Sequence, residues 1–255
     1  MTDSLDAPAA SDAMRAETIG LVGHRGDEIE AYLARPLERD AIGGVVVLHH
    51  MPGLDEHTRE VTRRLAAAGY LSICPNLYSR EAPGASPEDA FAVIWEQGGV
   101  DDEQVIGDVA GCTKHLGSLR QSNGRVAAIG FCAGGRQALL AGCSIPLAAT
   151  VDCYGSFVVN PPQAELNLRI TTIVHLVEQL SCPLLGLFGG DDQSPAPDEV
   201  AALAEALTEH GKDFEFHTHE DAGHAFFATN RPSYRVNAAN DGWLQIVDFF
   251  ERHIS

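Results

Sequence analysis

Basic residues are scarce in this chain of 255 residues. It contains 17 Lys and Arg against 36 Asp and Glu, which gives a formal net charge of −19 with neutral histidines. No tract rich in Lys or Arg occurs anywhere along it. Because so acidic a chain repels phosphate backbones and anionic lipid headgroups, we expect neither a nucleic-acid nor a membrane partner.

Long apolar runs are also absent, and none approaches the roughly 18 residues that a membrane-spanning helix needs. The first residues, MTDSLDAPAASDAM, are acidic and rich in alanine, without the basic start and apolar stretch of a secretory signal. We therefore expect a soluble, cytoplasmic protein. Residues 1–16 are predicted to form a disordered tail, and residues 17–255 a single domain.

Paired cysteine motifs are missing, since no C-x-x-C occurs, and this argues against a disulfide scaffold or a zinc knuckle. The six cysteines are Cys74, Cys112, Cys132, Cys143, Cys153 and Cys182. Five of them are expected to be buried small apolar residues. Cys132 differs from the others because it stands inside the glycine-rich stretch GFCAGG, residues 130–135.

Strand patterns and helix patterns alternate along the chain. Apolar runs typical of strands buried on both faces occur at residues 43–50, 70–75, 125–130, 147–155 and 183–190. Helix patterns occur at residues 56–69, 87–95, 101–119, 136–143, 198–211 and 234–253. The alternation predicts an α/β fold with a doubly wound, mostly parallel sheet covered by helices on both faces. Residues 156–181 interrupt the pattern and are either a cap over the strand ends or a connecting segment.

The stretch GFCAGG has the spacing of a nucleophile elbow, a tight turn from a strand into a helix. Such a turn needs small residues two before and two after the nucleophile, and Gly130 and Gly134 occupy those places. The sulfur of Cys132 would lie at the positive end of the helix dipole, which favours the thiolate. The amide of Ala133 would supply half of an oxyanion hole. The alternative is that Cys132 is a buried structural thiol.

A carboxylate and a histidine follow in the order that α/β-hydrolases use, which is nucleophile, acid, histidine. Asp191 and Asp192 come directly after the apolar run at residues 183–190, and His224 lies in the loop EDAGHAFF before the last helix pattern. Each could be an ordinary loop residue, but their joint order and placement favour a catalytic set with Cys132.

Four segments resemble the dienelactone hydrolase family of α/β-hydrolases, whose members are carboxymethylenebutenolidase-like. They are CPNLYSREAPG, SNGRVAAIGFCAGG, FGGDDQSPAP and EDAGHAFF, and the resemblance extends over roughly residues 28–250. It implies the α/β-hydrolase fold with Cys132 as nucleophile, Asp192 as acid and His224 as base. Asp192 is preferred to Asp191 because the family pattern reads Gly-x-x-Asp.

The resemblance also implies two amides and one arginine around the substrate. The amides of Met51 and Ala133 would hold the oxyanion, and Arg80 would pair with a substrate carboxylate. The family's second substrate arginine falls at Ala228, so that arginine is missing here. Arg231 or Arg235, both nearby in the sequence, could replace it.

A second departure from the family concerns activation of the thiol. The family's glutamate, which holds and helps to deprotonate the cysteine, falls at His50 in this chain. A neutral imidazole could accept the proton of Cys132, and a protonated one could pair with the thiolate. We hypothesise that His50 participates in thiol activation, the alternative being that it only shapes the pocket.

Together these features predict an enzyme that hydrolyses a small ester or lactone through an acyl-thioester intermediate on Cys132. No cofactor and no metal are expected, and the chain would act as a monomer or a homodimer. Two alternatives stay open. One is a metal-dependent hydrolase that uses His217, His219 and His224 of the stretch HTHEDAGH. The other is a binding or redox-sensing protein that has a hydrolase-like scaffold and no enzyme activity.

Overall fold

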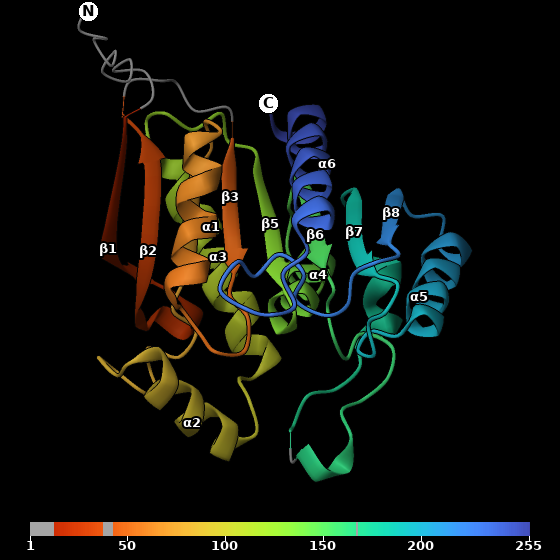
Figure 1. Cartoon of the computed structure of the whole chain (residues 1–255). Helices are drawn as coiled ribbons and strands as arrows, with labels where there is room; N and C mark the ends of the chain where they lie inside the picture. Colours follow the sequence, from red (N-terminus) through yellow and green to blue (C-terminus); the bar gives the residue numbers. More distant parts are fainter. Residues whose placement is uncertain (1–12, 38–42, 167) are drawn as a thin grey trace, which may run out of the picture.

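The computed structural model describes residues 13–37, 43–166 and 168–255 (Figure 1). Within these residues, eight strands form one sheet in the order β1-β2-β4-β3-β5-β6-β7-β8. The strands are β1 (Met14–Val22), β2 (Glu28–Pro36), β3 (Gly44–Leu48), β4 (Leu71–Pro75), β5 (Val126–Phe131), β6 (Ala149–Cys153), β7 (Leu184–Gly189) and β8 (Phe214–His219).

Strands β3 to β8 run parallel to one another, whereas β1 and β2 form an antiparallel hairpin that joins the sheet at β4. Every residue of the five central strands β3 to β7 is buried. This burial on both faces explains why these strands appear in the sequence as unbroken apolar runs. Because parallel strands end at one edge of the sheet, the residues that follow them meet there.

Helices cover both faces of the sheet, as the sequence predicts. One core cluster includes residues of α1 (Glu56–Ala67) and α6 (Val236–Ile254). The other includes residues of α3 (Asp102–Ser118), α4 (Ala133–Ser144) and α5 (Pro197–Glu209). The predicted doubly wound, mostly parallel sheet is thereby confirmed. A further helix, α2 (Pro87–Gln97), lies beyond the carboxyl ends of the strands (Figure 1).

The fold begins earlier in the chain than predicted. Strand β1 starts at Met14 and pairs with β2 through its whole length, so residues 14–16 are part of the sheet and the predicted tail is too long by these residues. Residues 1–12 of that tail lie outside the described residues. In the described parts of the chain, no helix is long and apolar enough to cross a membrane.

The segment at residues 156–181 contains two short 3-10 helices, η3 (Ala164–Leu166) and η4 (Val174–Gln179). Figure 1 shows part of it projecting beyond the same edge of the sheet as α2. The stretch from η4 onward packs against α4 and α5. The segment connects β6 to β7, and its role as a cap over the strand ends stays a prediction.

A carboxyl group is buried where β6 meets α4. Asp152 is fully buried, and its Oδ1 atom accepts a hydrogen bond of 2.7 Å from the amide of Gly155. Its Oδ2 atom has no partner among the described residues. Burial disfavours the carboxylate and raises the pKa of Asp152 to about 7, and the hydrogen bond from Gly155 only partly opposes this shift.

Asp152 should make the stability of the fold depend on pH. The pKa of Asp152 is about 7 in the folded protein, and its ordinary value is 3.8. Between about pH 4 and pH 7 this carboxyl group is ionised in the unfolded chain and still protonated in the folded protein. The free energy of unfolding therefore falls over this range and levels off above it. Asp152→Asn keeps an oxygen for the Gly155 amide and cannot ionise. We expect its free energy of unfolding in urea, relative to the wild type, to be higher at pH 8 than at pH 5. A difference that stays constant with pH would contradict the assignment.

Candidate active site

Cys132 lies in a strained turn between β5 and α4. Its backbone has φ of +57° and ψ of −123°, in a region that side chains rarely adopt. A Cβ atom on Gly130 would lie 1.8 Å from the carbonyl oxygen of Gly134, and one on Gly134 would lie 2.2 Å from the carbonyl oxygen of Leu48. Only glycine fits at either place, so the two glycines are required by the close approach of α4 to β3 and β5. The thiol of Cys132 is held at the tip of this turn.

Most of the residues with strained backbone lie around this turn. Four of the five described non-glycine residues with positive φ are Cys132, Tyr154, Phe157 and Ala225. The ring of Tyr154 packs edge-on against that of His224 at 5.1 Å, and Ala225 directly follows that histidine. Phe157 lines the adjacent pocket. Unfavourable backbone conformations persist where the surrounding structure enforces them, and they are typical of active sites.

His224 and Asp192 form a hydrogen-bonded pair beside the thiol. The Nδ1 atom of His224 lies 2.9 Å from Oδ2 of Asp192, whose other oxygen accepts a hydrogen bond of 2.9 Å from the amide of Ser194. Asp192 is almost fully buried, whereas the neighbouring Asp191 is exposed. Because Nδ1 faces the carboxylate, Nε2 is the atom left for Cys132.

The pKa of His224 reflects its interactions with both Asp192 and Cys132. Burial lowers its pKa, but hydrogen bonds to Asp192 and to Cys132, with the charges of both, outweigh burial and raise the pKa to about 10. The other five cysteines are buried, and burial raises the pKa of each of their thiols. Cys132 is the one partly exposed cysteine and the one that contacts a histidine base.

Two backbone amides beside the thiol have no hydrogen-bond partner in the described part of the chain. Neither the amide of Met51, which follows β3, nor that of Ala133, the first residue of α4, donates a hydrogen bond to another described residue. The carbonyl oxygen of Met51 is fixed by the hydroxyl of Tyr78, which donates to it at 2.6 Å. Unpaired amides at a helix start and at a strand end can stabilise a developing negative charge.

The structure joins His50 to Asp55 rather than to the thiol. Its Nε2 atom lies 2.7 Å from Oδ2 of Asp55, and among the described residues no hydrogen bond connects it with Cys132. Asp55 also caps α1 by accepting from the amide and hydroxyl of Thr58. Burial raises the pKa of Asp55, but hydrogen bonds from His50 and Thr58 outweigh it and hold the value well below its usual range. The pair closes the loop that carries Met51.

Arg80 does not line the pocket beside the elbow. Its guanidinium donates to both oxygens of the buried Asp108, at 2.8 and 2.7 Å, and to Asp27 at 2.9 Å. The guanidinium of Arg80, which was expected to bind a substrate carboxylate, is therefore already bound by these two aspartates. The two arginines considered as replacements, Arg231 and Arg235, are exposed.

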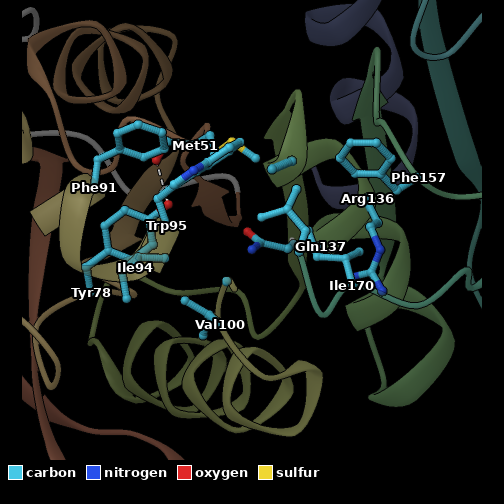
Figure 2. Close-up of a pocket in the computed structure, with 13 residues that line it drawn as sticks. Met51, Tyr78, Phe91, Ile94, Trp95, Val100, Arg136, Gln137, Phe157 and Ile170 are labelled. Carbon is cyan, nitrogen blue, oxygen red and sulfur yellow. Dashed lines mark hydrogen bonds between the residues drawn. The ribbon is translucent and has the colours of Figure 1, made fainter. Parts of the chain in front are cut away.

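A largely apolar pocket lies beside the elbow (Figure 2). Its cavity volume is about 40 Å³, and the empty space around it, open solvent included, is about 520 Å³. Helix α2 and the segment at 156–181 provide most of its apolar wall, and Met51 and Ala133 lie at its border with the elbow. The lining residues are Met51, Tyr78, Phe91, Ile94, Trp95, Gly99, Val100, Ala133, Arg136, Gln137, Phe157, Leu168 and Ile170.

Several of these residues were not anticipated from the sequence. Phe91 and Trp95 are spaced as an i,i+4 pair in α2, and their rings lie 5.6 Å apart. This aromatic pair on a short helix was the available signal. Arg136 gave no signal, because its partners are remote in sequence: it donates to both oxygens of Asp102, at 2.7 and 2.8 Å, and to the carbonyl of Thr171 at 2.7 Å.

The histidines considered as metal ligands do not converge. His224 is paired with Asp192, while His217 and His219 belong to β8. Across residues 13–37, 43–166 and 168–255, no group of three or more His, Cys, Asp or Glu side chains is arranged to hold a metal ion. The metal-dependent alternative therefore has no support in this geometry.

Comparison with known proteins agrees with the fold and the motifs. The model of the "Dienelactone hydrolase family" matches residues 29–254. A "Putative carboxymethylenebutenolidase" of Salmonella typhimurium is 34% identical, with 97% of this chain and 95% of that protein covered. One of Escherichia coli is 35% identical, with 90% and 84% covered. A crystal structure of a "Putative Dienelactone Hydrolase" from Klebsiella pneumoniae superimposes with a TM-score of 0.83 at 30% identity, covering 94% of this chain and 100% of that one.

Replacement of Gly134 should disrupt the elbow. In Gly134→Ala the new methyl group meets the carbonyl of Leu48 at 2.2 Å, so we expect a loss of about 2 kcal/mol or more in the free energy of unfolding. Gly117→Ala in α3 is the matched control, because its methyl group has no neighbour within 4 Å. That change should stabilise the helix by about 0.5 to 1 kcal/mol. Equal stabilities of the two variants in urea unfolding would show that the close approach is not required.

Proposed function

This chain belongs to the dienelactone hydrolase family of α/β-hydrolases, and we propose that it hydrolyses a small ester or lactone with Cys132 as its nucleophile. The observation that carries the proposal is the strained turn that holds Cys132 beside the His224–Asp192 pair. A thiol, an imidazole that contacts it and a buried carboxylate on the far nitrogen are the parts that nucleophilic catalysis needs.

In the proposed acylation step, Nε2 of His224 takes the proton of the thiol, and Sγ of Cys132 attacks the substrate carbonyl carbon. The amides of Met51 and Ala133 hold the oxygen that becomes negatively charged, which their free N–H groups allow. The tetrahedral intermediate then collapses: the carbon–oxygen bond to the alcohol breaks, and His224 returns its proton to the leaving oxygen. The acyl group remains on Cys132 as a thioester.

In the proposed deacylation step, His224 takes a proton from a water molecule, which attacks the thioester carbon. The carbon–sulfur bond then breaks, the acid product leaves, and Cys132 is regenerated. Asp192 holds the imidazole in the required orientation and stabilises its protonated form through the hydrogen bond to Nδ1. This scheme uses no cofactor and no metal. We also propose that the enzyme works in the cytoplasm, as a monomer or a homodimer.

We further propose that His50 assists the activation of the Cys132 thiol. It lies in the loop that carries Met51, and the carbonyl oxygen of the preceding residue, His49, lies close to Gly134 of the elbow. The carboxylate of Asp55 fixes the imidazole there. An effect of His50 on Cys132 would therefore act through its charge or through the position of the Met51 loop.

Cys132 should be the one reactive cysteine of the native protein, because the other five are buried. We expect iodoacetamide to add one carbamidomethyl group per chain, at Cys132, and to abolish ester hydrolysis, with peptide mass spectrometry locating the adduct. Cys132→Ala should lose at least about 10³-fold in kcat and keep its melting temperature, since the side chain is partly exposed at a turn.

The same assay separates this proposal from the alternatives. A metal-dependent hydrolase would lose activity in EDTA and keep it in Cys132→Ala, and either result contradicts the proposal. A binding or redox-sensing protein would hydrolyse no member of an ester, thioester and lactone panel. Mass spectrometry of a rapidly quenched reaction should find the acyl group on Cys132, and the added mass would identify the group.

The role of His50 is tested by two substitutions. His50→Gln keeps a donor that can reach Asp55 but cannot titrate, whereas His50→Ala loses the link to the loop altogether. If His50 assists ionisation of the thiol, we expect kcat/KM in His50→Gln to fall several-fold and the acid limb of its pH profile to move. An unchanged profile in His50→Gln, with activity lost only in His50→Ala, would limit the residue to fixing the loop.

A further inference from the structure

The pocket beside the elbow contains two buried polar atoms without partners. Nε of Arg136 and Oε1 of Gln137 form no hydrogen bond within the described part of the chain, and both residues line the pocket. In Figure 2 the Gln137 amide points across the pocket toward the side of Trp95. A buried polar group without a partner costs free energy, so a ligand that supplied a hydrogen bond to Oε1 of Gln137 would be favoured.

The rest of the lining is aromatic and aliphatic. Phe91 and Trp95 of α2 face Phe157 and Ile170 of the segment at 156–181 (Figure 2). Rings in such a setting prefer edge-on or offset contacts with another ring, and they add a specific attraction to the burial of apolar surface. The wall therefore suits an aromatic group better than a short or strongly hydrated one.

The pocket offers no unpaired positive charge to an anionic group. Of the charged side chains in the described residues, Arg136 alone lines it, and this guanidinium is bound to both oxygens of Asp102. Arg80 is bound to Asp108 and Asp27. A carboxylate that entered would lose its hydration without gaining an ion pair, which is unfavourable in apolar surroundings.

The position of the pocket relative to His224 decides which half of the substrate enters it. Met51 and Ala133 line the pocket, so it begins where the carbonyl oxygen would be held. Neither His224 nor any residue of its loop lines it. The leaving oxygen must face His224 to receive a proton, so the alcohol lies on that side. The acyl group is then the part that extends into the pocket.

We propose that the acyl half of the substrate is an uncharged aromatic group with a hydrogen-bonding atom, such as a phenolic hydroxyl, at its far end. The ring packs between α2 and the segment at 156–181, and its polar hydrogen is donated to Oε1 of Gln137. This inference rests on the proposed function, since it assigns a substrate class to the site that contains Cys132.

A series of four esters with one leaving group tests the inference. They are the para-nitrophenyl esters of acetic acid, phenylpropanoic acid, para-hydroxyphenylpropanoic acid and para-carboxyphenylpropanoic acid, assayed by kcat/KM and corrected for spontaneous hydrolysis. We expect the hydroxyphenyl ester to be hydrolysed best, the phenyl ester about tenfold better than the acetate, and the carboxyphenyl ester about tenfold worse than the phenyl ester.

Two variants connect these preferences with named residues. Gln137→Leu should abolish the advantage of the hydroxyphenyl over the phenyl ester, because it removes the amide and keeps a side chain of similar size. Trp95→Ala should reduce the ratio of phenylpropanoate to acetate hydrolysis by about tenfold. Leu244→Ala, which alters an exposed residue of α6 outside this pocket, is the control and should leave every ratio unchanged.

The acetate ester separates failure of the inference from failure of the proposed function. If none of the four esters is hydrolysed, or hydrolysis persists in Cys132→Ala, the proposed function itself is wrong. If acetate hydrolysis depends on Cys132 but the aromatic esters are no better, or the carboxyphenyl ester equals the phenyl ester, only the inference is overturned. A preference for aromatic groups that appears in the alcohol half instead, in acetates of aryl alcohols, also overturns it.

Discussion

The close approach of α4 to the carboxyl ends of β3 and β5 is the constraint on which this site depends. Gly130 and Gly134 permit backbone contacts that a single methyl group would prevent, and Cys132 is forced to a positive φ between them. The same approach sets the amides of Ala133 and Met51, which have no partner among the described residues, at one edge of the sheet. A rigid turn of this kind presents its thiol without further ordering, which is the geometric requirement for a nucleophile.

Ion pairs that engage two arginines give the surroundings of this turn their chemical character. Arg136 is held by Asp102, and Arg80 by Asp108 and Asp27. Each pair joins elements that are distant in sequence, and each neutralises an arginine that could otherwise attract an anionic substrate. In a protein with a net charge of −19, the remaining pocket is apolar and nearly uncharged. Arg80, which the resemblance assigns to a substrate carboxylate, has its guanidinium bound to Asp108 and Asp27 instead.

The fold could be predicted almost entirely, because its signals are local. Burial on both faces makes each central strand an apolar run, and each helix shows its own amphipathic period. The start of β1 was predicted too late. Met14 pairs with Pro36 of β2, and the sequence of one strand does not show which residues it will pair with. In the site, the spacing of GFCAGG and the order of Cys132, Asp192 and His224 were informative, because the turn requires small residues at fixed distances.

The sequence by itself determined which residues stand at the strand ends, and therefore the set from which a triad could be built. Only the tertiary structure decided how each side chain is used: His50 binds Asp55, Arg80 binds Asp108, and α2 closes the pocket with Phe91 and Trp95. The physical reason is that a strand end fixes a backbone position, whereas hydrogen bonds, ion pairs and packing depend on partners that come from other parts of the chain. Substrate specificity therefore depends on contacts that only the tertiary structure shows, whereas the chemistry of the turn follows from backbone positions at the strand ends.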